Sequence, residues 1–215
     1  MIARIIAELL FAVTRFVVGG QPRWRGCEPS HEQRIYFANH ASHLDTIILC
    51  AAMPSYLRAT THPVAAADYW GTGPIQRFIA LNVLNAVLVE RAGSRDPLAP
   101  MREALDKGES LIIFPEGTRR TDALPGQFRA GLYHLAKEFP EAQLIPVYLT
   151  NLARAYPKGA ILPAPISSAA HFGTRVARKD NENKAEFLAR AQAAIIALAD
   201  NPSETSSPEL AKEEG

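Results

Sequence analysis

The sequence predicts a single α/β domain with a mostly parallel or mixed sheet flanked by helices and preceded by an amphipathic helix. Short apolar runs alternate with helical patterns along most of the chain. The 215 residues suit one domain of ordinary size, and no internal repeat divides them. We expect an amphipathic, membrane-facing helix over 1–20, the main domain over 21–200 and a disordered acidic tail over 201–215.

The first residues have helical periodicity, with one broad apolar stripe. The stripe consists of Ile2, Ile5, Ile6, Leu9, Leu10, Val13, Phe16 and Val17. Arg4, Glu8 and Arg15 lie opposite it and interrupt any membrane span or cleaved signal peptide. The helix either packs on the core of the domain or lies on a lipid surface, and the following cluster Arg23-Trp24-Arg25 favours lipid headgroups. We expect a peripheral protein on the cytoplasmic face of a membrane.

The remaining elements follow from apolar runs and from Gly and Pro punctuation. The expected strands are Arg34–Ala38, Pro63–Ala67, Asn85–Val89, Leu111–Phe114, Leu144–Leu149 and Ala170–Val176. The expected helices are Ser42–Met53, Gly73–Leu84, Pro97–Lys107, Gln127–Phe139 and Lys184–Ala199.

Bulk composition excludes some classes of function. The formal net charge of +1 excludes a strongly basic nucleic-acid binder, so no nucleic-acid partner is expected. Cys27 and Cys50 belong to no CxxC motif or Cys/His cluster, which fits a reducing compartment and argues against a disulfide framework or a zinc finger.

The run IYFANHASHLD places a buried strand directly before His40. Ser42 is a candidate N-cap, so His40 is expected where the strand ends and a helix begins. Ligands bind at that edge of open α/β sheets. Asp45, about one turn into the helix, is placed to reach back to one ring nitrogen of His40 and to leave the other free as a base for an alcohol.

Metal binding is the alternative interpretation of this run, because His40, His43 and Asp45 are all possible ligands. A two-metal loop of the HxHxDH kind would need histidines where Ala41 and Thr46 stand. We therefore expect no metal, and we expect His43 to be a packing or substrate-edge residue.

The run LIIFPEGTRR predicts a buried strand followed by a tight turn. Pro115 forces the exit from the strand, and Gly117 permits a positive φ. Backbone amides of such a turn form a nest for an anion, and Arg119 and Arg120 add donors suited to phosphate. Glu116 would accept a hydrogen bond from a substrate hydroxyl. A polyol phosphate as substrate therefore explains both the negative charge of Glu116 and the positive charges of the arginines. The alternative is a solvated turn with a surface ion pair.

Two further strand ends carry informative residues. VLVERAG places Arg91 just past a strand, so several guanidinium groups meet His40 at one edge if the strands are parallel. LIPVYL carries Pro146, which is awkward in a central strand and suggests an edge, a bulge or the wall of a pocket.

These four blocks, NHASHLD, VLVERAG, FPEGTR and LIPVYL, span Ile35 to Leu149 in the order found in a known family. The chain resembles the glycerolipid acyltransferase family that includes 1-acylglycerol-3-phosphate acyltransferases. The histidine, four intervening residues and aspartate of the first block match the family's pattern. The sequence departs from it at Glu90, where the family usually has aspartate, and in VAAADYW, where many members carry a lysine.

The resemblance implies that His40 is the general base and Asp45 its orienting partner. It implies that the acceptor is held by Arg91, Glu116, Gly117, Thr118 and Arg119, and that Pro146 helps to shape the acyl pocket. The implied reaction moves a fatty acyl group from acyl-CoA or acyl carrier protein onto a lysophospholipid hydroxyl at a membrane surface, in phospholipid biosynthesis or remodelling, with no metal or bound cofactor.

Two other functions remain open from the residues. A thioester hydrolase would use the same base on water, and a non-catalytic lipid-binding protein would have no use for an oriented base. GxSxG is absent, so no covalent acyl-enzyme is expected.

Overall fold

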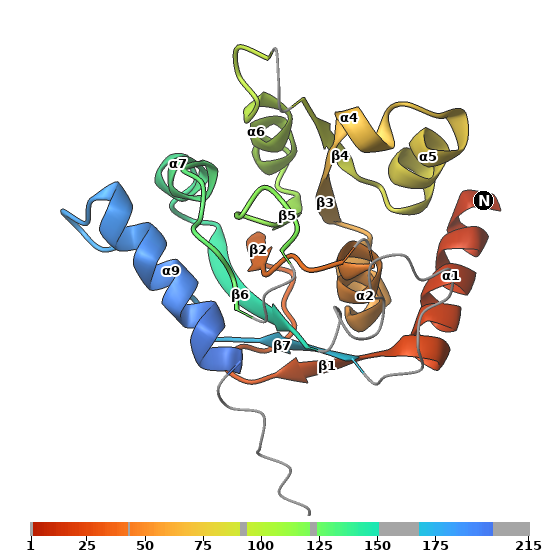
Figure 1. Ribbon diagram of the computed structural model, residues 1–215, viewed down its shortest axis with the longest axis horizontal. Helices are drawn as coiled ribbons and strands as arrows, with labels where there is room; N and C mark the ends of the chain where they lie inside the picture. Colours follow the sequence, from red (N-terminus) through yellow and green to blue (C-terminus); the bar gives the residue numbers. More distant parts are fainter. Residues whose placement is uncertain (1, 43, 91–93, 121–123, 151–167, 200–215) are drawn as a thin grey trace, which may run out of the picture.

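The computed structural model describes residues 2–42, 44–90, 94–120, 124–150 and 168–199. Its centre is a seven-stranded sheet in the order β1-β7-β6-β2-β5-β3-β4 (Figure 1). The strands are β1 Gly19–Trp24, β2 Arg34–Ala38, β3 Thr61–Ala66, β4 Val87–Val89, β5 Ser110–Ile113, β6 Gln143–Leu149 and β7 Ser168–Phe172. Neighbours are parallel except β6 and β7, so the sheet is mixed and the predicted fold class is confirmed.

Helices cover both faces of this sheet. One face carries α1 Ile2–Val18, α2 Asp45–Ala52 and the π-helical turn η1 Ile79–Val83, and the other carries α6 Ala99–Asp106, α7 Gly131–Glu138 and α9 Lys184–Ala199. In β2, Tyr36 and Ala38 belong to the first core and Ile35 and Phe37 to the second. Strands buried on both faces are typical of a parallel sheet in an α/β protein.

Three short helices complete the described part of the chain: α3 Ser55–Arg58, α4 Ala67–Trp70 and α5 Pro74–Phe78. The expected helix Gly73–Leu84 is thus divided into α5 and η1, with Pro74 at the first helical position. The strand expected over Ala170–Val176 begins earlier and ends at Phe172. The expected tail over 201–215 lies outside the described residues.

The segment after α1 differs most from expectation, because residues 19–24 form the edge strand β1. Gly and Pro lower the strand propensity of this run, although an edge strand tolerates Pro22. Trp24 stacks on Phe172 of β7 with ring centroids 3.9 Å apart. Trp24 therefore packs on the sheet, whereas the flanking Arg23 and Arg25 are exposed.

Helix α1 packs on the domain through a narrow side of uncharged residues, and Glu8 and Arg15 pair with the domain at its border. Its buried residues are Ala7, Phe11, Thr14 and Val18. Glu8 pairs with Arg58 at 2.7 Å, and Arg15 donates hydrogen bonds to the carbonyl oxygens of Ala51 and Met53. The helix does pack on the core, as one interpretation expects, but of its apolar stripe only Leu10 and Val17 take part.

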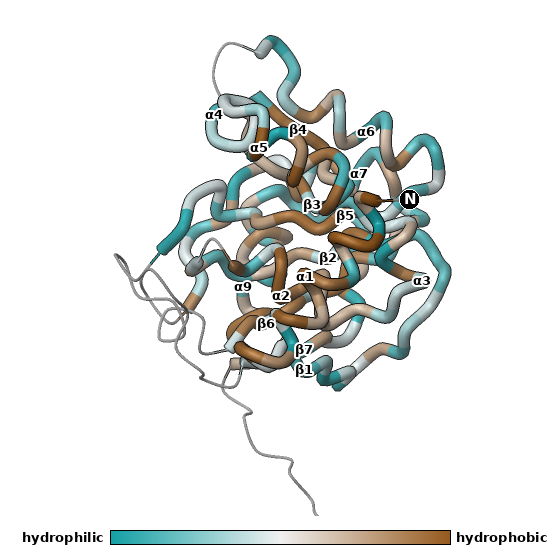
Figure 2. Tube along the Cα trace, turned by 90° about the vertical axis from the view of Figure 1, so that its right-hand side faces the viewer, coloured by the Kyte–Doolittle hydropathy of each residue, from teal (hydrophilic) through white to brown (hydrophobic). Residues whose placement is uncertain are grey.

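Most of that apolar stripe is exposed. The exposed set is Ile2, Ile5, Ile6, Leu9, Val13 and Phe16, and the Phe16 side chain is 91% exposed. Figure 2 looks onto this side of the molecule, where the trace of α1 is largely coloured hydrophobic. An amphipathic helix usually turns its apolar side to the core, whereas α1 also exposes a large apolar side. None of the described helices is long and apolar enough to cross a membrane.

Pro146 lies in β6, between β7 and β2, so of the three alternatives for this proline the edge position is wrong. Its carbonyl oxygen accepts a hydrogen bond from Gly173 N at 2.9 Å, just beyond the end of β7. The N–H and C=O of one strand residue face the same neighbour. The missing N–H of Pro146 therefore faces β7 where the ladder has ended, which explains how an interior strand accommodates proline.

A buried histidine in β7 predicts a dependence of stability on pH. Burial, with the positive charges of Arg25 and Arg23, lowers the pKa of His171 from 6.5 to about 4. The unfolded chain then binds a proton between these two values while the folded chain does not, so stability falls as the pH drops from 6.5 towards 4. We expect the urea midpoint of His171→Gln to fall less between pH 7 and pH 5 than that of the unaltered protein. His134→Gln, at an exposed position, should show the same fall as the unaltered protein. Equal slopes for His171→Gln and the unaltered protein would contradict this assignment.

Candidate active site

The carboxyl ends of five parallel strands meet at one edge of the sheet. His40 follows β2, the FPEGTR turn follows β5, and Leu149 ends β6. Hydrogen bonds that involve Asn39 and His40 join these three strand ends. This edge is where open α/β sheets bind their ligands.

The His40 ring is held by a carboxylate and by an aromatic ring. Its Nδ1 lies 2.8 Å from Oδ2 of Asp45, and the side chain is 16% exposed while that of Asp45 is fully buried. The ring stacks on Phe114, with centroids 4.3 Å apart. Two contacts fix its orientation, and Nε2 is the nitrogen left for the cavity that His40 lines.

Asp45 is held in turn by the backbone that precedes it. Its Oδ2 accepts hydrogen bonds from the backbone N–H groups of Ala41 and Ser42, at 2.6 and 2.9 Å. Asp45 is also the first residue of α2, where the helix dipole stabilises a negative charge. These donors keep the carboxylate in place beside the imidazole.

The helix begins three residues later than expected, so Ser42 is not its N-cap. Ser42 Oγ accepts instead from Leu44 N at 3.1 Å, within the loop between β2 and α2. Ser and Asp both satisfy backbone donors in such loops, and here the carboxylate takes the larger share. Asp45 therefore reaches His40 from the start of the helix rather than from its second turn.

Glu116 joins the FPEGTR turn to the histidine loop. Its Oε1 accepts from His40 N at 2.9 Å, and its Oε2 accepts from Gly126 N at 2.8 Å. The residue is only 5% exposed, and the carbonyl oxygen of His40 accepts in turn from Arg120 N at 2.9 Å. The structure thus engages both carboxylate oxygens with backbone donors, rather than leaving them to a substrate hydroxyl.

Asn39 makes the corresponding connection to β6. Its Oδ1 accepts from Leu149 N at 2.8 Å, and its Nδ2 donates to Leu149 O at 3.2 Å. Through Glu116 and Asn39, the FPEGTR and LIPVYL blocks are attached to the NHASHLD block that carries His40. The remaining block, VLVERAG, contains Arg91, which lies outside the described residues.

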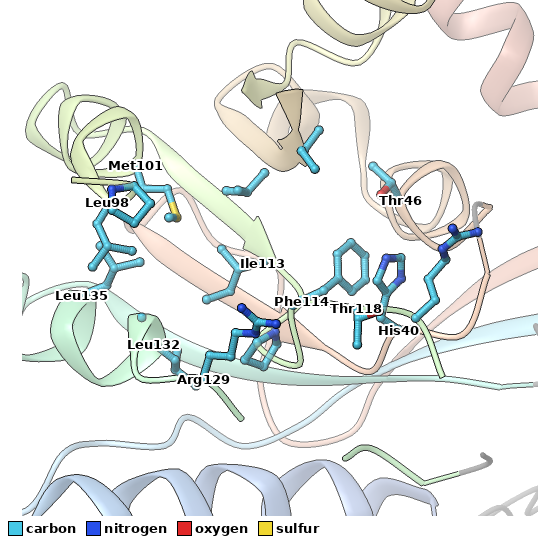
Figure 3. A pocket seen from close by; sticks show the side chains of 18 of the residues that line it. His40, Thr46, Leu98, Met101, Ile113, Phe114, Thr118, Arg129, Leu132 and Leu135 are labelled. Carbon is cyan, nitrogen blue, oxygen red and sulfur yellow. The ribbon is translucent and has the colours of Figure 1, made fainter. Parts of the chain in front are cut away.

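A cavity of about 700 Å³ opens beside His40 (Figure 3). This volume is within the usual range for small-molecule sites. In Figure 3 the polar residues His40 and Thr118 lie toward one end and Arg129 lies between them and Leu135, and Arg119 also lines the cavity. Elsewhere its lining is largely apolar, from β3, β5, α6 and α7, and includes Val64, Leu98, Met101, Ile113, Leu132 and Leu135. The cavity suits a ligand with a charged end and a hydrocarbon chain.

The cavity contains some of the predicted site residues and not others. Gly117, Thr118 and Arg119 line it together with His40. Glu116 and Pro146 are not among its described lining residues. His43, like Arg91, falls outside the residues that the structure describes. Within the described ranges, no group of three His, Cys, Asp or Glu residues is placed to hold a metal ion.

The sequence interpretation missed Arg129 and the apolar lining. Arg129 precedes α7, and Leu132 and Leu135 follow it at helical spacing, so their pattern alone indicates an ordinary amphipathic helix. Asn39 was visible as a polar residue directly after a buried strand, but its partner in β6 lies 110 residues away. Only the pairing of β2 with β6 makes that contact predictable.

The chain belongs to the acyltransferase family, whose model matches residues 22–150, more than half of its length. The chain is similar to the 1-acyl-sn-glycerol-3-phosphate acyltransferase of Limnanthes douglasii, at 28% identity over 165 residues that cover 70% of this chain and 56% of the relative. It is similar to the 1-acyl-sn-glycerol-3-phosphate acyltransferase alpha of Mus musculus, at 23% identity, covering 71% of this chain and 53% of the relative. The chain thus spans about half the length of these relatives.

A solved structure shows the same fold. It is the crystal structure of the 1-acyl-sn-glycerophosphate (LPA) acyltransferase PlsC from Thermotoga maritima. The TM-score is 0.72 at 21% identity, and the match covers 94% of this chain and 80% of that one. The predicted family and fold are confirmed.

Proposed function

We propose that this chain is an O-acyltransferase that moves a fatty acyl group from a thioester donor, acyl-CoA or acyl carrier protein, onto the hydroxyl of a lysophospholipid such as 1-acylglycerol-3-phosphate. The main support is the contact between the buried Asp45 carboxylate and Nδ1 of His40. His40 lines a cavity that combines polar residues with a largely apolar remainder. The names of the relatives support the acceptor.

The proposed chemistry is direct transfer. Nε2 of His40 removes the proton from the acceptor hydroxyl as its oxygen attacks the thioester carbonyl carbon. The new C–O bond forms, the C–S bond breaks, and the proton passes from His40 to the leaving thiolate. Asp45 stabilises the imidazolium between these steps. Among the described residues that line the cavity there is no serine or cysteine to form an acyl-enzyme.

The two parts of the cavity support this assignment. Arg119 and the turn at Gly117 and Thr118 would bind the charged headgroup of the acceptor. The apolar wall between α6 and α7 would hold a hydrocarbon chain and exclude water from the thioester. Glu116 would position His40 through its backbone.

A lipid surface is the proposed partner of α1. Six large apolar side chains of this helix are exposed, while its charged side is occupied by Arg58 and by backbone carbonyls. Exposed apolar area of this kind is energetically unfavourable in water and favourable in the headgroup layer of a membrane. The helix would then hold the domain on the membrane that contains its acceptor.

The proposed contact of α1 with lipid predicts that removal of two of these side chains weakens membrane binding. We expect Leu9→Gln combined with Phe16→Gln to lower binding to phospholipid vesicles by about 10-fold or more, because each buried side chain contributes about 1.5–3 kcal/mol. Co-sedimentation measures this directly. Tyr56→Gln is the matched control, since Tyr56 is exposed at 44% but lies on α3. Unchanged sedimentation of the double variant would show that α1 is not the membrane contact.

Product analysis tests the proposed reaction. Purified protein is mixed with a labelled acyl thioester, either the coenzyme A or the carrier-protein form, and a panel of lysophospholipids. We expect a diacyl product, identified by mass, only when donor and acceptor are both present. Free fatty acid released at the same rate without acceptor would identify a hydrolase, and binding without any turnover would identify a lipid-binding protein.

A further inference from the structure

Arg129 lies outside all four sequence blocks, yet it is attached to the FPEGTR turn at two points. Its backbone N–H donates to Pro115 O at 2.8 Å, and its side-chain Nε donates to Glu116 O at 3.4 Å. With Nε directed at the turn, the two terminal nitrogens form the outer edge of the guanidinium. Figure 3 shows this group pointing into the cavity.

Gly117 makes this position possible. Its φ is +69°, a conformation that favours glycine. A Cβ built on Gly117 would collide with Nε and Cδ of Arg129, so the arginine side chain lies against the bare backbone of the turn. Close approach of a guanidinium to a turn that can bind anions concentrates positive charge at one place.

The charges of the cavity leave Arg129 available for an anion. The described charged or titratable lining residues are His40, Asp68, Tyr69, Arg119, Arg129 and His134. No ion pair joins Arg129 to a carboxylate of the described residues. The wall formed by β3 and α4 contributes only Asp68 as a charge. A guanidinium with two outer donors matches two oxygens of a phosphate.

The position of Arg129 in the cavity indicates which phosphate it meets. In Figure 3 it lies between His40 and the apolar residues Leu132 and Leu135. Because His40 and Arg129 line the same cavity, a phosphate at Arg129 and a hydroxyl at His40 can belong to one acceptor molecule. We propose that Arg129 binds the phosphomonoester of the acceptor lipid and sets the preference for phosphorylated acceptors. This inference rests on the proposed acyl transfer.

Arg129→Ala tests the inference with two acceptors, lysophosphatidate and a monoacylglycerol that lacks the phosphate. We expect kcat/KM for lysophosphatidate to fall by about 30-fold or more, chiefly through KM, because a charge-assisted hydrogen bond is lost. The value for the monoacylglycerol should change by no more than about twofold. Arg129→Lys should recover part of the loss, because it keeps the charge without the planar fork. Arg178→Ala, at an exposed arginine outside the cavity, is the matched control.

Two outcomes of this comparison overturn the inference. An equal loss for both acceptors would mean that Arg129 only positions the turn. A loss that occurs with acyl-CoA but disappears with an acyl-pantetheine donor, which carries no phosphate, would assign the guanidinium to the donor.

Binding of glycerol 3-phosphate, followed by phosphorus NMR, separates this inference from the proposed reaction. We expect Arg129→Ala to weaken that binding by about 10-fold or more. Equal affinities, or no binding to the unaltered protein, would overturn the role of Arg129 even if acyl transfer is observed. Absence of acyl transfer together with Arg129-dependent binding would instead reject the reaction and keep the phosphate site.

Discussion

His40→Ala is expected to leave a folded protein whose acyl transfer is at least ~100-fold slower, the lower range for removal of a general base. The ring is partly exposed in the cavity, and its loss removes the stacking contact with Phe114 and the contact with Asp45, whose Oδ2 keeps its two backbone donors. The fall should therefore be in kcat, measured with saturating donor and acceptor, while the thermal midpoint changes little.

The matched control is His31→Ala, which removes an exposed histidine from the segment before β2. It should transfer acyl groups at the normal rate. If His40→Ala also retains near-normal transfer, the base is a different group and the proposed mechanism is wrong. Diacyl product formed per unit time, with melting followed on the same samples, gives both quantities.

Asp45→Asn is expected to reduce transfer by a factor on the order of 10² to 10⁴, because the imidazolium loses its negative partner. The substitution also creates a structural conflict. Oδ2 accepts from two backbone N–H groups and faces Nδ1 of His40, while Oδ1 is buried without a hydrogen-bond partner among the described residues. The amide oxygen would take the position of Oδ2, and the amide N–H groups would be buried without an acceptor.

That conflict predicts a loss of stability of about 1–3 kcal/mol, which urea unfolding measures separately from activity. The signals of the His40 ring protons in NMR spectra should shift as well, because the partner of Nδ1 loses its charge. Asp106→Asn, at an exposed position of α6, is the control and should alter neither rate nor stability. A normal rate for Asp45→Asn would exclude an orienting role for the carboxylate.

Much of the fold could be predicted because its signals are local. Strand β2 and helix α9 have the bounds that apolar periodicity predicts. His40 and the FPEGTR turn were assigned to strand ends for the same reason, since a strand followed by Pro or Gly is visible in a short window. Parallel strands then bring those ends to one edge, which is why His40 and Gly117 line one cavity.

The roles of Glu116 and Arg129 could not be predicted in this way. Glu116 was assigned to a substrate hydroxyl, but in the structure it accepts from backbone donors of His40 and Gly126. Arg129 resembles any charged residue before a helix until the turn at Gly117 is placed against it. Both roles depend on distances between segments that are separate in the chain.

The sequence by itself determined the class of fold, the order of most of its elements and which polar residues stand at strand ends, because periodicity and turn chemistry act within a few residues. The tertiary structure alone decided that α1 leaves most of its apolar stripe exposed, that β1 joins β7 as an edge strand, and that α6 and α7 form the apolar wall of the cavity. A helical wheel distinguishes two faces but not which one meets the protein. That choice depends on partners such as Arg58, whose position is set by the packing of the whole domain.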